Sequence, residues 1–278
     1  MRIALAQQTA TPDRAANLAT ALTNMRRASK DGAELIVFPE LALDQFFPQH
    51  ERFANAEKIA EPVPGPTCDA IAKEAKALGL VTVFNLYEAG GHGEFYDASP
   101  VFDADGSLLG VTRMVHITDY ACFHEKAYYT PGNRGAPVYA TRAGKIGVAI
   151  CYDRHYPEYM RALGVGGAEL VVIPQAGADG EWPEGVYEGE VRTAAFQNGY
   201  FAALCNRVGK EGQLTFSGES FVVDPEGRVI AKGSRLADDL LIADIDLSKV
   251  SESTARRLFW RDRRPDLYGD WLNPNPGR

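Results

Sequence analysis

Lys145-Ile-Gly-Val-Ala-Ile-Cys151-Tyr-Asp-Arg-His-Tyr-Pro157-Glu158 is the stretch that decides the fold of this 278-residue chain. It opens with a short apolar run, residues 146–150, of the kind that forms a strand buried on both faces. The run stops at Cys151, and Pro157 then suits the first turn of a helix. A thiol at the end of a buried strand is held rigidly and can still face a cleft, so Cys151 is a candidate nucleophile. A small cysteine of the core is an equally good interpretation of this stretch alone.

The composition is that of a globular protein, with 45% hydrophobic and 24% charged residues. A formal net charge of −8 argues against a surface for nucleic acid or anionic membrane. No apolar run approaches the ~20 residues of a membrane span, and the apolar part of the N-terminus is too short for a signal peptide. We therefore expect a cytoplasmic protein whose partner is a small molecule, with no nucleic acid and no membrane.

Metal and cofactor signatures are missing from the sequence. The four cysteines are scattered without a Cys-x-x-Cys pair, and the five histidines form no zinc-type set. No Gly-x-Gly-x-x-Gly follows a strand, so a dinucleotide site has no support. We expect free thiols, no metal and no cofactor.

The order of elements predicts a layered α/β protein with mixed sheets, because strands alternate with helices early and in the middle and form hairpins between and after. Helices are expected at 11–32, 67–78, 157–163 and 190–198. Strands are expected at 2–8, 33–38, 80–86, 98–103, 108–114, 146–150, 168–173, 200–205, 219–224, 229–232 and 240–245. Two irregular stretches, 116–137 and 174–190, are long enough to indicate a functional role.

A short internal similarity suggests two related halves. Gly32-Ala-Glu-Leu-Ile-Val-Phe-Pro-Glu40 resembles Gly167-Ala-Glu-Leu-Val-Val-Ile-Pro-Gln175, and both follow a predicted helix. Two sheets packed face to face would then carry Glu40 and Gln175 at equivalent strand ends, facing the same cleft as Cys151.

A catalytic cysteine needs a base or a nearby cation, because a thiol with a pKa of about 8.5 is mostly protonated at neutral pH. Glu40 is a candidate base, with an exposed carboxylate at a loop start as the alternative. Glu125 is a second acid, with a solvated loop charge as its alternative. The backbone N–H of Tyr152 lies next to the thiol in the chain and is a candidate oxyanion donor.

Several motifs resemble the nitrilase superfamily of carbon–nitrogen hydrolases over nearly the whole chain. They are Phe38-Pro39-Glu40-Leu41, the Glu125-Lys126 pair before Tyr-Tyr-x-Pro-Gly, and Gly147-Val-Ala-Ile-Cys151-Tyr-Asp-Arg-x-x-Pro. Three further motifs look most like the N-carbamoylputrescine amidase and β-ureidopropionase branches: Asn206-Arg207-Val208-Gly209, Asp224-Pro-Glu-Gly227 and Arg261-Asp-Arg-Arg-Pro-Asp-Leu-Tyr268.

The resemblance implies a four-layer α-β-β-α sandwich, one domain over residues 1–260, and a tail, 261–278, that packs on the core or on a partner subunit of a homodimer or larger homo-oligomer. It implies hydrolysis of an amide or N-carbamoyl bond through a thioester, without a metal. Carried over by position, Cys151 is the nucleophile, Glu40 the general base and Glu125 the supporting carboxylate.

One position departs from the family. Its enzymes carry a catalytic lysine in an Arg-Lys-x-His pattern, eleven residues before the second glutamate, and here Arg113-Met114-Val115-His116 places Met114 there (125 − 114 = 11). A thioether cannot stabilise an oxyanion as an ammonium does, a donor worth ~3 kcal/mol. Lys126 supplies the cation instead, or the enzyme is slow or acts on an activated substrate, or the protein is a binding relative that does not hydrolyse. We favour retained hydrolysis.

Substrate specificity is expected in residues 116–124 and 174–190. Trp182 and Tyr187 offer aromatic walls there, and the acids are Glu181, Glu184 and Glu188. An acidic lining suits an amine-bearing substrate such as a carbamoylated polyamine, and solvated acids are the equal alternative. A nitrilase or plain aliphatic amidase remains the other enzymatic interpretation.

Overall fold

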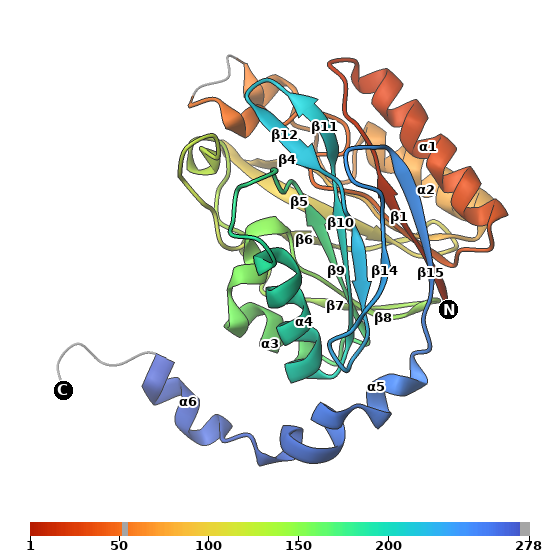
Figure 1. Cartoon of the computed structure of the whole chain (residues 1–278). Coiled ribbons are helices and arrows are strands. Elements are labelled where there is room, and N and C mark those ends of the chain that lie inside the picture. The colour runs from red at the N-terminus through yellow and green to blue at the C-terminus, as the bar shows by residue number, and fades with distance from the viewer. Residues whose placement is uncertain (52–54, 273–278) are drawn as a thin grey trace.

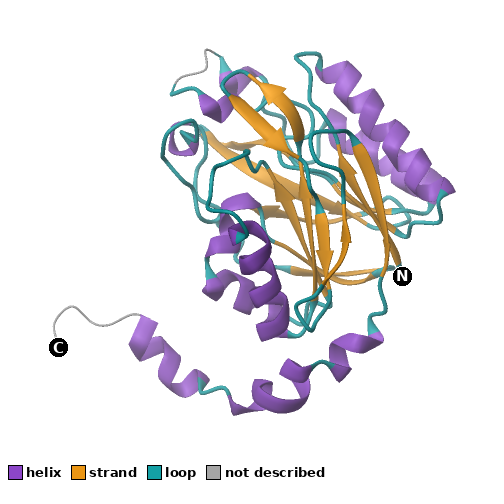
Figure 2. Ribbon diagram, in the orientation of Figure 1, coloured by secondary structure: helices purple, strands orange, loops and turns teal. Residues whose placement is uncertain are grey.

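Two mixed β-sheets lie face to face at the centre of the computed structural model, which describes residues 1–51 and 55–272 (Figures 1 and 2). The first sheet has the order β15 (Asp239–Asp244), β1 (Arg2–Gln7), β2 (Leu35–Val37), β3 (Val81–Val83), β5 (Glu94–Phe102), β4 (Leu86–Gly91), with β6 (Leu108–Arg113) also paired to β5. The second has the order β14 (Val229–Lys232), β13 (Phe221–Val223), β10 (Phe201–Asn206), β9 (Leu170–Gln175), β8 (Gly144–Val148), β7 (Val138–Thr141). A hairpin of β11 (Val208–Glu211) and β12 (Leu214–Ser217) follows β10.

Helices cover the outer face of each sheet, as Figures 1 and 2 show. The first sheet carries α1 (Arg14–Lys30) and α2 (Pro66–Leu78), and the second carries α3 (Pro157–Val165) and α4 (Val186–Asn198). The predicted four-layer α-β-β-α sandwich with two mixed sheets is therefore confirmed.

The alternation of strand side chains explains why the central strands are apolar throughout. On β9, Leu170 and Val172 belong to the core between the sheets, whereas Val171 and Ile173 pack against α3 and α4. A strand covered on both faces needs apolar residues at every position. The apolar run before Cys151 has the same cause.

The element boundaries differ from the sequence prediction where short-range signals were ambiguous. The helix expected from residue 11 begins at Arg14, and Asp13 caps it, because the Asp13 carboxylate accepts hydrogen bonds from the N–H groups of Ala15 and Ala16. The strand expected at 80–86 is two strands, β3 and β4. Strands β7, β11 and β12 were not predicted, and α4 begins at Val186, four residues earlier than expected.

The C-terminal segment runs below the sandwich and leads away from it to α6 (Pro265–Leu272) (Figure 1). It includes α5 (Ser248–Glu252), a π-helical turn (Ala255–Phe259) and a 3₁₀ turn (Trp260–Asp262). The Trp260 ring lies under the Arg161 guanidinium of α3 at 4.8 Å, so the chain packs on the core up to this residue. The division at residue 260 and the packing of 261–278 stay predictions, and residues 273–278 lie outside the described residues. Within the described ranges, no helix has the length and apolarity to cross a bilayer.

Candidate active site

Three predicted side chains meet between the sheets. Glu40, Glu125 and Cys151 each place one oxygen or sulfur atom within 4.8 Å of the others, and all three residues are buried. Glu40 lies just after β2 of the first sheet, and Cys151 begins a 3₁₀ turn just after β8 of the second. Glu125 begins a 3₁₀ turn inside the irregular stretch 116–137. A base and a nucleophile in mutual reach form the arrangement that nucleophilic catalysis requires.

The backbone at Cys151 adopts a left-handed conformation, with φ of 43°. Such a conformation is costly for a residue with a Cβ and is retained where the surroundings impose it. Gln175 at the end of β9 donates from Nε2 to Cys151 Sγ at 3.1 Å, while Arg154 donates to the Cys151 carbonyl at 3.0 Å and to Gln175 Oε1 at 3.1 Å. These contacts fix the thiol and its turn. The backbone N–H of Tyr152 lies in the first turn of this short helix, where no helical carbonyl precedes it.

Asp153 ties the nucleophile turn to the neighbouring sheet. Its buried carboxylate accepts hydrogen bonds from the backbone N–H groups of Val115 and His116, and it lies 2.7 Å from His116 Nδ1. The segment that follows β6, which starts with Met114, is thereby held beside Cys151. The sequence favours Asp153 and Arg154 as residues that brace this turn, but it does not indicate the contacts of Asp153 with Val115 and His116.

Arg207 fixes the loop that carries Glu40. Its buried guanidinium donates to the Glu40 carbonyl at 3.0 Å and to the Asp44 carbonyl at 2.8 Å. A buried ion pair of 2.6 Å with Glu211 balances the guanidinium charge. The motif that contains Arg207 supported the family resemblance, but the sequence did not indicate which part of the site the residue contacts.

Burial shapes the electrostatics of the three reacting groups. Desolvation, and then the neighbouring Glu125, raise the pKa of Glu40 to about 7. Desolvation raises the pKa of Glu125 well above its usual range. Desolvation also raises the pKa of the Cys151 thiol, as do Glu40 and Glu125. The thiol is therefore protonated at rest, and a base in contact must take its proton when it attacks.

Lys126 does not join these groups. Its residue is exposed, whereas Glu125 beside it is fully buried. An ammonium in water is screened and cannot stabilise charge in a buried site as a desolvated donor does. This exposure argues against the alternative in which Lys126 supplies the missing cation, and that alternative stays open to test. Met114 is fully buried in the core between the sheets.

Asp97 is a buried acid of this region that the sequence analysis missed. It lies on β5 and accepts a hydrogen bond of 2.6 Å from Asn85 Nδ2, and Asn85 Oδ1 in turn accepts the N–H of Leu41, next to Glu40. Nothing in the local sequence separates Asp97 from an ordinary strand residue. Its position becomes visible only when β5 is placed in the sheet.

The stretch 174–190 contributes an aromatic and acidic wall. The hydroxyl groups of Tyr120 and Tyr187 both donate to the Glu181 carboxylate. The Trp182 ring packs edge-on against His155, with centroids 4.9 Å apart, and against Tyr120 at 5.8 Å. Glu181 is close enough to Cys151 for its charge to raise the thiol pKa.

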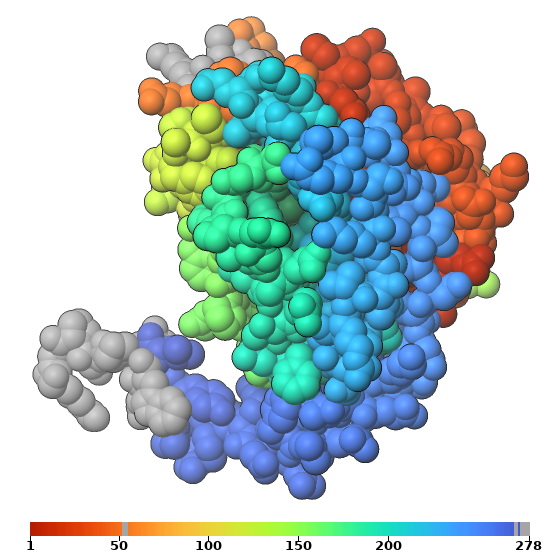
Figure 3. Space-filling view, viewed as in Figure 1, coloured from red at the N-terminus to blue at the C-terminus, as the bar shows by residue number. Residues whose placement is uncertain are grey.

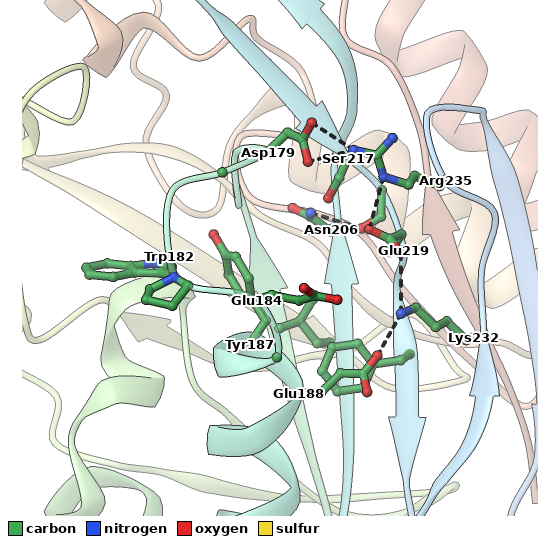
Figure 4. Close-up of a pocket in the computed structure, with 16 residues that line it drawn as sticks. Asp179, Trp182, Glu184, Tyr187, Glu188, Asn206, Ser217, Glu219, Lys232 and Arg235 are labelled. Carbon is green, nitrogen blue, oxygen red and sulfur yellow. Dashed lines mark hydrogen bonds and ion pairs between the residues drawn. The ribbon is translucent and has the colours of Figure 1, made fainter.

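A cavity of about 560 Å³ lies beside this stretch, between the start of α4 and the strands β13 and β14 (Figure 4). Figure 3 shows this face hollowed where the green and blue segments meet. A chain of ion pairs crosses the cavity wall; its members are Asp179, Arg235, Glu219, Lys232 and Glu188. Trp182, Glu184 and Tyr187 also line it. Its lining among the described residues includes none of Glu40, Glu125 and Cys151.

Only one group of three close metal-type donors occurs among the described residues, and it is Glu40, Glu125 and Cys151 themselves. Carboxylates and a thiolate are ligands that zinc accepts. The same atoms would then be unavailable for nucleophilic chemistry. The expectation of no metal stays a prediction.

The chain is similar to carbon-nitrogen hydrolases and amidases. A family model described as carbon-nitrogen hydrolase matches residues 2–255. N-carbamoylputrescine amidase of Solanum lycopersicum is 34% identical, over 96% of this chain and 93% of the relative. Citrullinase of Francisella tularensis subsp. tularensis is 31% identical, over 97% of both chains.

Solved structures agree with these sequences. A carbon-nitrogen hydrolase from Helicobacter pylori G27 superposes with a TM-score of 0.91 at 31% identity, over 98% of each chain. An amidase mutant from Nesterenkonia sp. AN1 superposes with a TM-score of 0.82 at 29% identity, over 98% of this chain and 97% of the other. In that structure the acetamide moiety of fluoroacetamide is covalently added at the active site cysteine.

The raised pKa of Glu40 predicts a pH-dependent cost to stability. The folded state keeps the Glu40 proton up to pH of about 7, whereas the unfolded chain loses it near 4.5. Stability linked to this group is thus present below pH 4.5 and is lost as the pH rises through 7. Glu40→Gln removes the effect, so the variant should gain stability over the wild type between these pH values, by up to about 3 kcal/mol. Urea unfolding across this range measures the difference. Glu158→Gln, an exposed control, should show no such trend, and a difference that stays flat with pH for Glu40→Gln would contradict the raised pKa.

Proposed function

The chain belongs to the carbon-nitrogen hydrolase family and is a cysteine-dependent hydrolase, and from this premise we propose that it cleaves the N-carbamoyl bond of an amine-bearing small molecule through a thioester at Cys151. The observation that carries the proposal is the buried contact of Glu40, Glu125 and Cys151. The reaction consumes the N-carbamoyl amine and water, and it releases the free amine, ammonia and carbon dioxide.

In the proposed first half, Glu40 takes the thiol proton as Cys151 Sγ attacks the carbamoyl carbon. The carbon becomes tetrahedral, and its oxyanion accepts a hydrogen bond from the Tyr152 N–H. Glu40 then passes its proton to the leaving nitrogen, the C–N bond breaks, and the carbamoyl group stays on sulfur. A carboxyl group with a pKa of about 7 suits both duties at neutral pH.

In the proposed second half, Glu40 takes a proton from a water molecule that attacks the same carbon. The C–S bond breaks, Glu40 returns its proton to the thiolate, and the released carbamic acid decomposes to ammonia and carbon dioxide. Glu125 supports both halves as a neutral carboxyl group, in accord with its raised pKa. A neutral Glu125 adds no negative charge to a site in which an oxyanion forms.

Removing the nucleophile tests this mechanism. Cys151→Ala should lower turnover by at least about 10⁴-fold, since the covalent route is lost. The covalent adduct that intact mass spectrometry detects with a slow substrate should also vanish. Cys68→Ala is the matched control, because Cys68 is a free thiol on α2, outside the site and outside the stretches expected to contact substrate. Normal hydrolysis by the Cys151→Ala variant would refute the mechanism.

Two substitutions test whether a lysine side chain stabilises the oxyanion. Lys126→Ala should leave kcat within about twofold of the wild type, because an exposed ammonium contributes little to a buried site. Met114→Lys should raise kcat by about tenfold or more, since it adds a desolvated donor among buried acids. Steady-state kinetics on one substrate decides both. A large loss in Lys126→Ala would restore that residue as the oxyanion donor, and an inactive but folded Met114→Lys would count against a cation at this position.

We further propose that the substrate carries an ammonium group, on the strength of two acidic features. Glu181 lies near Cys151 and is held in place by two tyrosine hydroxyls and the Ala178 N–H. The adjoining cavity is lined by four acids and two bases: Asp179, Glu184, Glu188, Glu219, Lys232 and Arg235. The surplus of two formal negative charges favours a cation (4 − 2 = 2). The relative named N-carbamoylputrescine amidase fits this chemistry.

A matched substrate panel tests the charge preference. N-carbamoylputrescine should be hydrolysed with a kcat/KM at least tenfold above that of N-carbamoylbutylamine, its neutral counterpart, and far above that of N-carbamoyl-β-alanine. Glu181→Gln should raise KM for the cationic substrate about tenfold and leave the neutral one nearly unchanged. Ammonia release is the readout, and simple amides and nitriles complete the panel. Preference for the carboxylate substrate would refute the cationic proposal, and preference for amides or nitriles would indicate the plain amidase or nitrilase alternative.

A further inference from the structure

Asp97 and Met114 are cross-strand neighbours at the edge of the site. The β5–β6 register pairs Ala98 with Arg113, and the next pair along the ladder is Asp97 with Met114, whose N–H donates to the Asp97 carbonyl at 2.9 Å. Paired residues of an antiparallel ladder present their side chains on the same face. An acid therefore lies beside the position where the family resemblance expects an ammonium.

The Asp97 carboxyl lies beside the Glu40 loop, because Asn85 links it to the N–H of Leu41, the residue after Glu40. Both acids are fully buried, and each of them shifts the pKa of the other. Asn85 donates to Asp97 Oδ1. No N–H or hydroxyl donor of the described residues reaches Asp97 Oδ2 or either Glu40 oxygen. Ionised carboxylates only accept hydrogen bonds, so two of them in contact inside a protein repel each other unless they hold a proton between them.

No nearby base removes the need for that proton. The Arg207 guanidinium donates to backbone carbonyls and to Glu211. The Arg154 guanidinium donates to the Cys151 carbonyl and to Gln175. Lys126 is exposed. Burial raises the pKa of Glu40 more than the charge of Arg207 lowers it, and no base of the described residues donates a hydrogen bond to either carboxyl group.

We propose that Asp97 is a positioning residue that shares one proton with Glu40 and holds it while Glu40 acts as the base. The inference rests on the proposed function, which gives Glu40 that role. Asp97 does the work that a cation would do in keeping Glu40 ionised, but it does so as a neutral O–H donor. Desolvation and the charge of Glu40 raise the pKa of Asp97 well above its usual range, in agreement with a proton on Asp97.

The protons balance at each step. Before attack, Asp97 is neutral, Glu40 is a carboxylate and Cys151 is a thiol. When the thiol proton moves to Glu40, both acids are neutral and the sulfur forms its bond to carbon. The Glu40 proton leaves with the amine, whereas the Asp97 proton stays and again donates to the Glu40 carboxylate. Asp97 touches neither substrate nor sulfur and acts only through Glu40.

Two substitutions at Asp97 distinguish a hydrogen-bond donor to Glu40 from a side chain that only fills space. Asp97→Ala removes the donor, so the pKa of Glu40 should rise. The acid limb of kcat/KM should then move up by about one pH unit, with a loss of about tenfold in rate at pH 6.5. Asp97→Asn keeps an N–H donor that cannot ionise. It should return the acid limb to its wild-type position and recover most of the lost rate. Ser99→Ala, a buried neighbour that contacts Asn85 and not Glu40, should leave the limb in place.

A second readout keeps the result independent of the substrate. The rate at which iodoacetamide alkylates Cys151, followed against pH, should shift in Asp97→Ala and be restored in Asp97→Asn, since Glu40 assists deprotonation of the thiol in both reactions. An Asp97→Ala profile that is unshifted, or a shift that Asp97→Asn does not restore, would overturn the proton-sharing proposal.

Infrared spectroscopy at neutral pH detects the shared proton directly, so the proposal can be tested even if Asp97→Ala does not fold. The protonated-carboxyl absorption of the wild type should lose one group in Asp97→Asn, whether or not Asp97→Ala folds. An unchanged absorption would overturn the proposal. If no N-carbamoyl compound or amide is hydrolysed while the alkylation profiles behave as expected, the proposed function fails and the shared proton stands. If hydrolysis is normal and the profiles do not move, the shared proton fails alone.

Discussion

The buried ion pair between Arg207 and Glu211 joins the second sheet to the loop that follows β2, and the rest of the site depends on it. Arg207 donates to the carbonyls of Glu40 and Asp44, and Glu211 accepts the N–H of Phe46. Both charges are almost fully removed from water. Removal of one partner from such a pair typically costs ~3–5 kcal/mol, because the other is left without compensation. The pair therefore fixes the backbone of Glu40 against a strand of the opposite sheet, so that the Glu40 carboxyl from one half of the sandwich lies near the Cys151 thiol from the other.

This construction leaves the reacting groups short of positive charge. The charge of Arg207 is paired with Glu211 and that of Arg154 with Glu190, and the residue opposite Asp97 is an apolar methionine. Buried acids without a cation keep protons rather than charges. Desolvation raises the pKa values of Glu40, Asp97, Glu125 and the thiol, and the neighbouring negative charges add to these shifts. On the proposed function, the chemistry moves protons among the acids and the thiol and forms no stable ion pair between them.

The sequence predicted the parts of the site that depend on strand ends. The apolar run before Cys151 and the similar runs before Glu40 and Gln175 report burial on both faces, and a strand that ends beside its neighbours delivers the next polar residue to the same edge. The internal similarity alone predicted that Gln175 faces the same cleft as Cys151. The Gln175 amide does contact the thiol. The layered fold followed from the same periodicity.

Other parts of the structure depend on contacts that sequence spacing does not encode. Lys126 follows Glu125 in the chain, yet a 3₁₀ turn sends the two residues to opposite environments, one buried and one exposed. Asp97 lies in a strand whose apolar pattern it interrupts without any flanking motif, and its meaning depends on the pairing of β5 with β6. The short strands β7, β11 and β12 have four residues each, too few for a period-2 pattern to stand out from a loop.

The acidic wall connects substrate choice to the chemistry. Burial and the charges of Glu40 and Glu125 account for most of the rise in the pKa of Cys151, and Glu181, in the irregular stretch 174–190, adds to it. A neutral ligand leaves the charge of Glu181 in place and leaves the thiol harder to ionise. An ammonium bound at Glu181 offsets the charge and lowers the cost of forming negative sulfur, by the same Coulomb interaction that raised it. On the proposed function, a cationic substrate therefore gains twice, once in binding and once in the attack, and the second gain appears in kcat rather than in KM. Discrimination of this kind needs no cationic residue in the site, because the substrate itself brings the positive charge that the position of Met114 lacks.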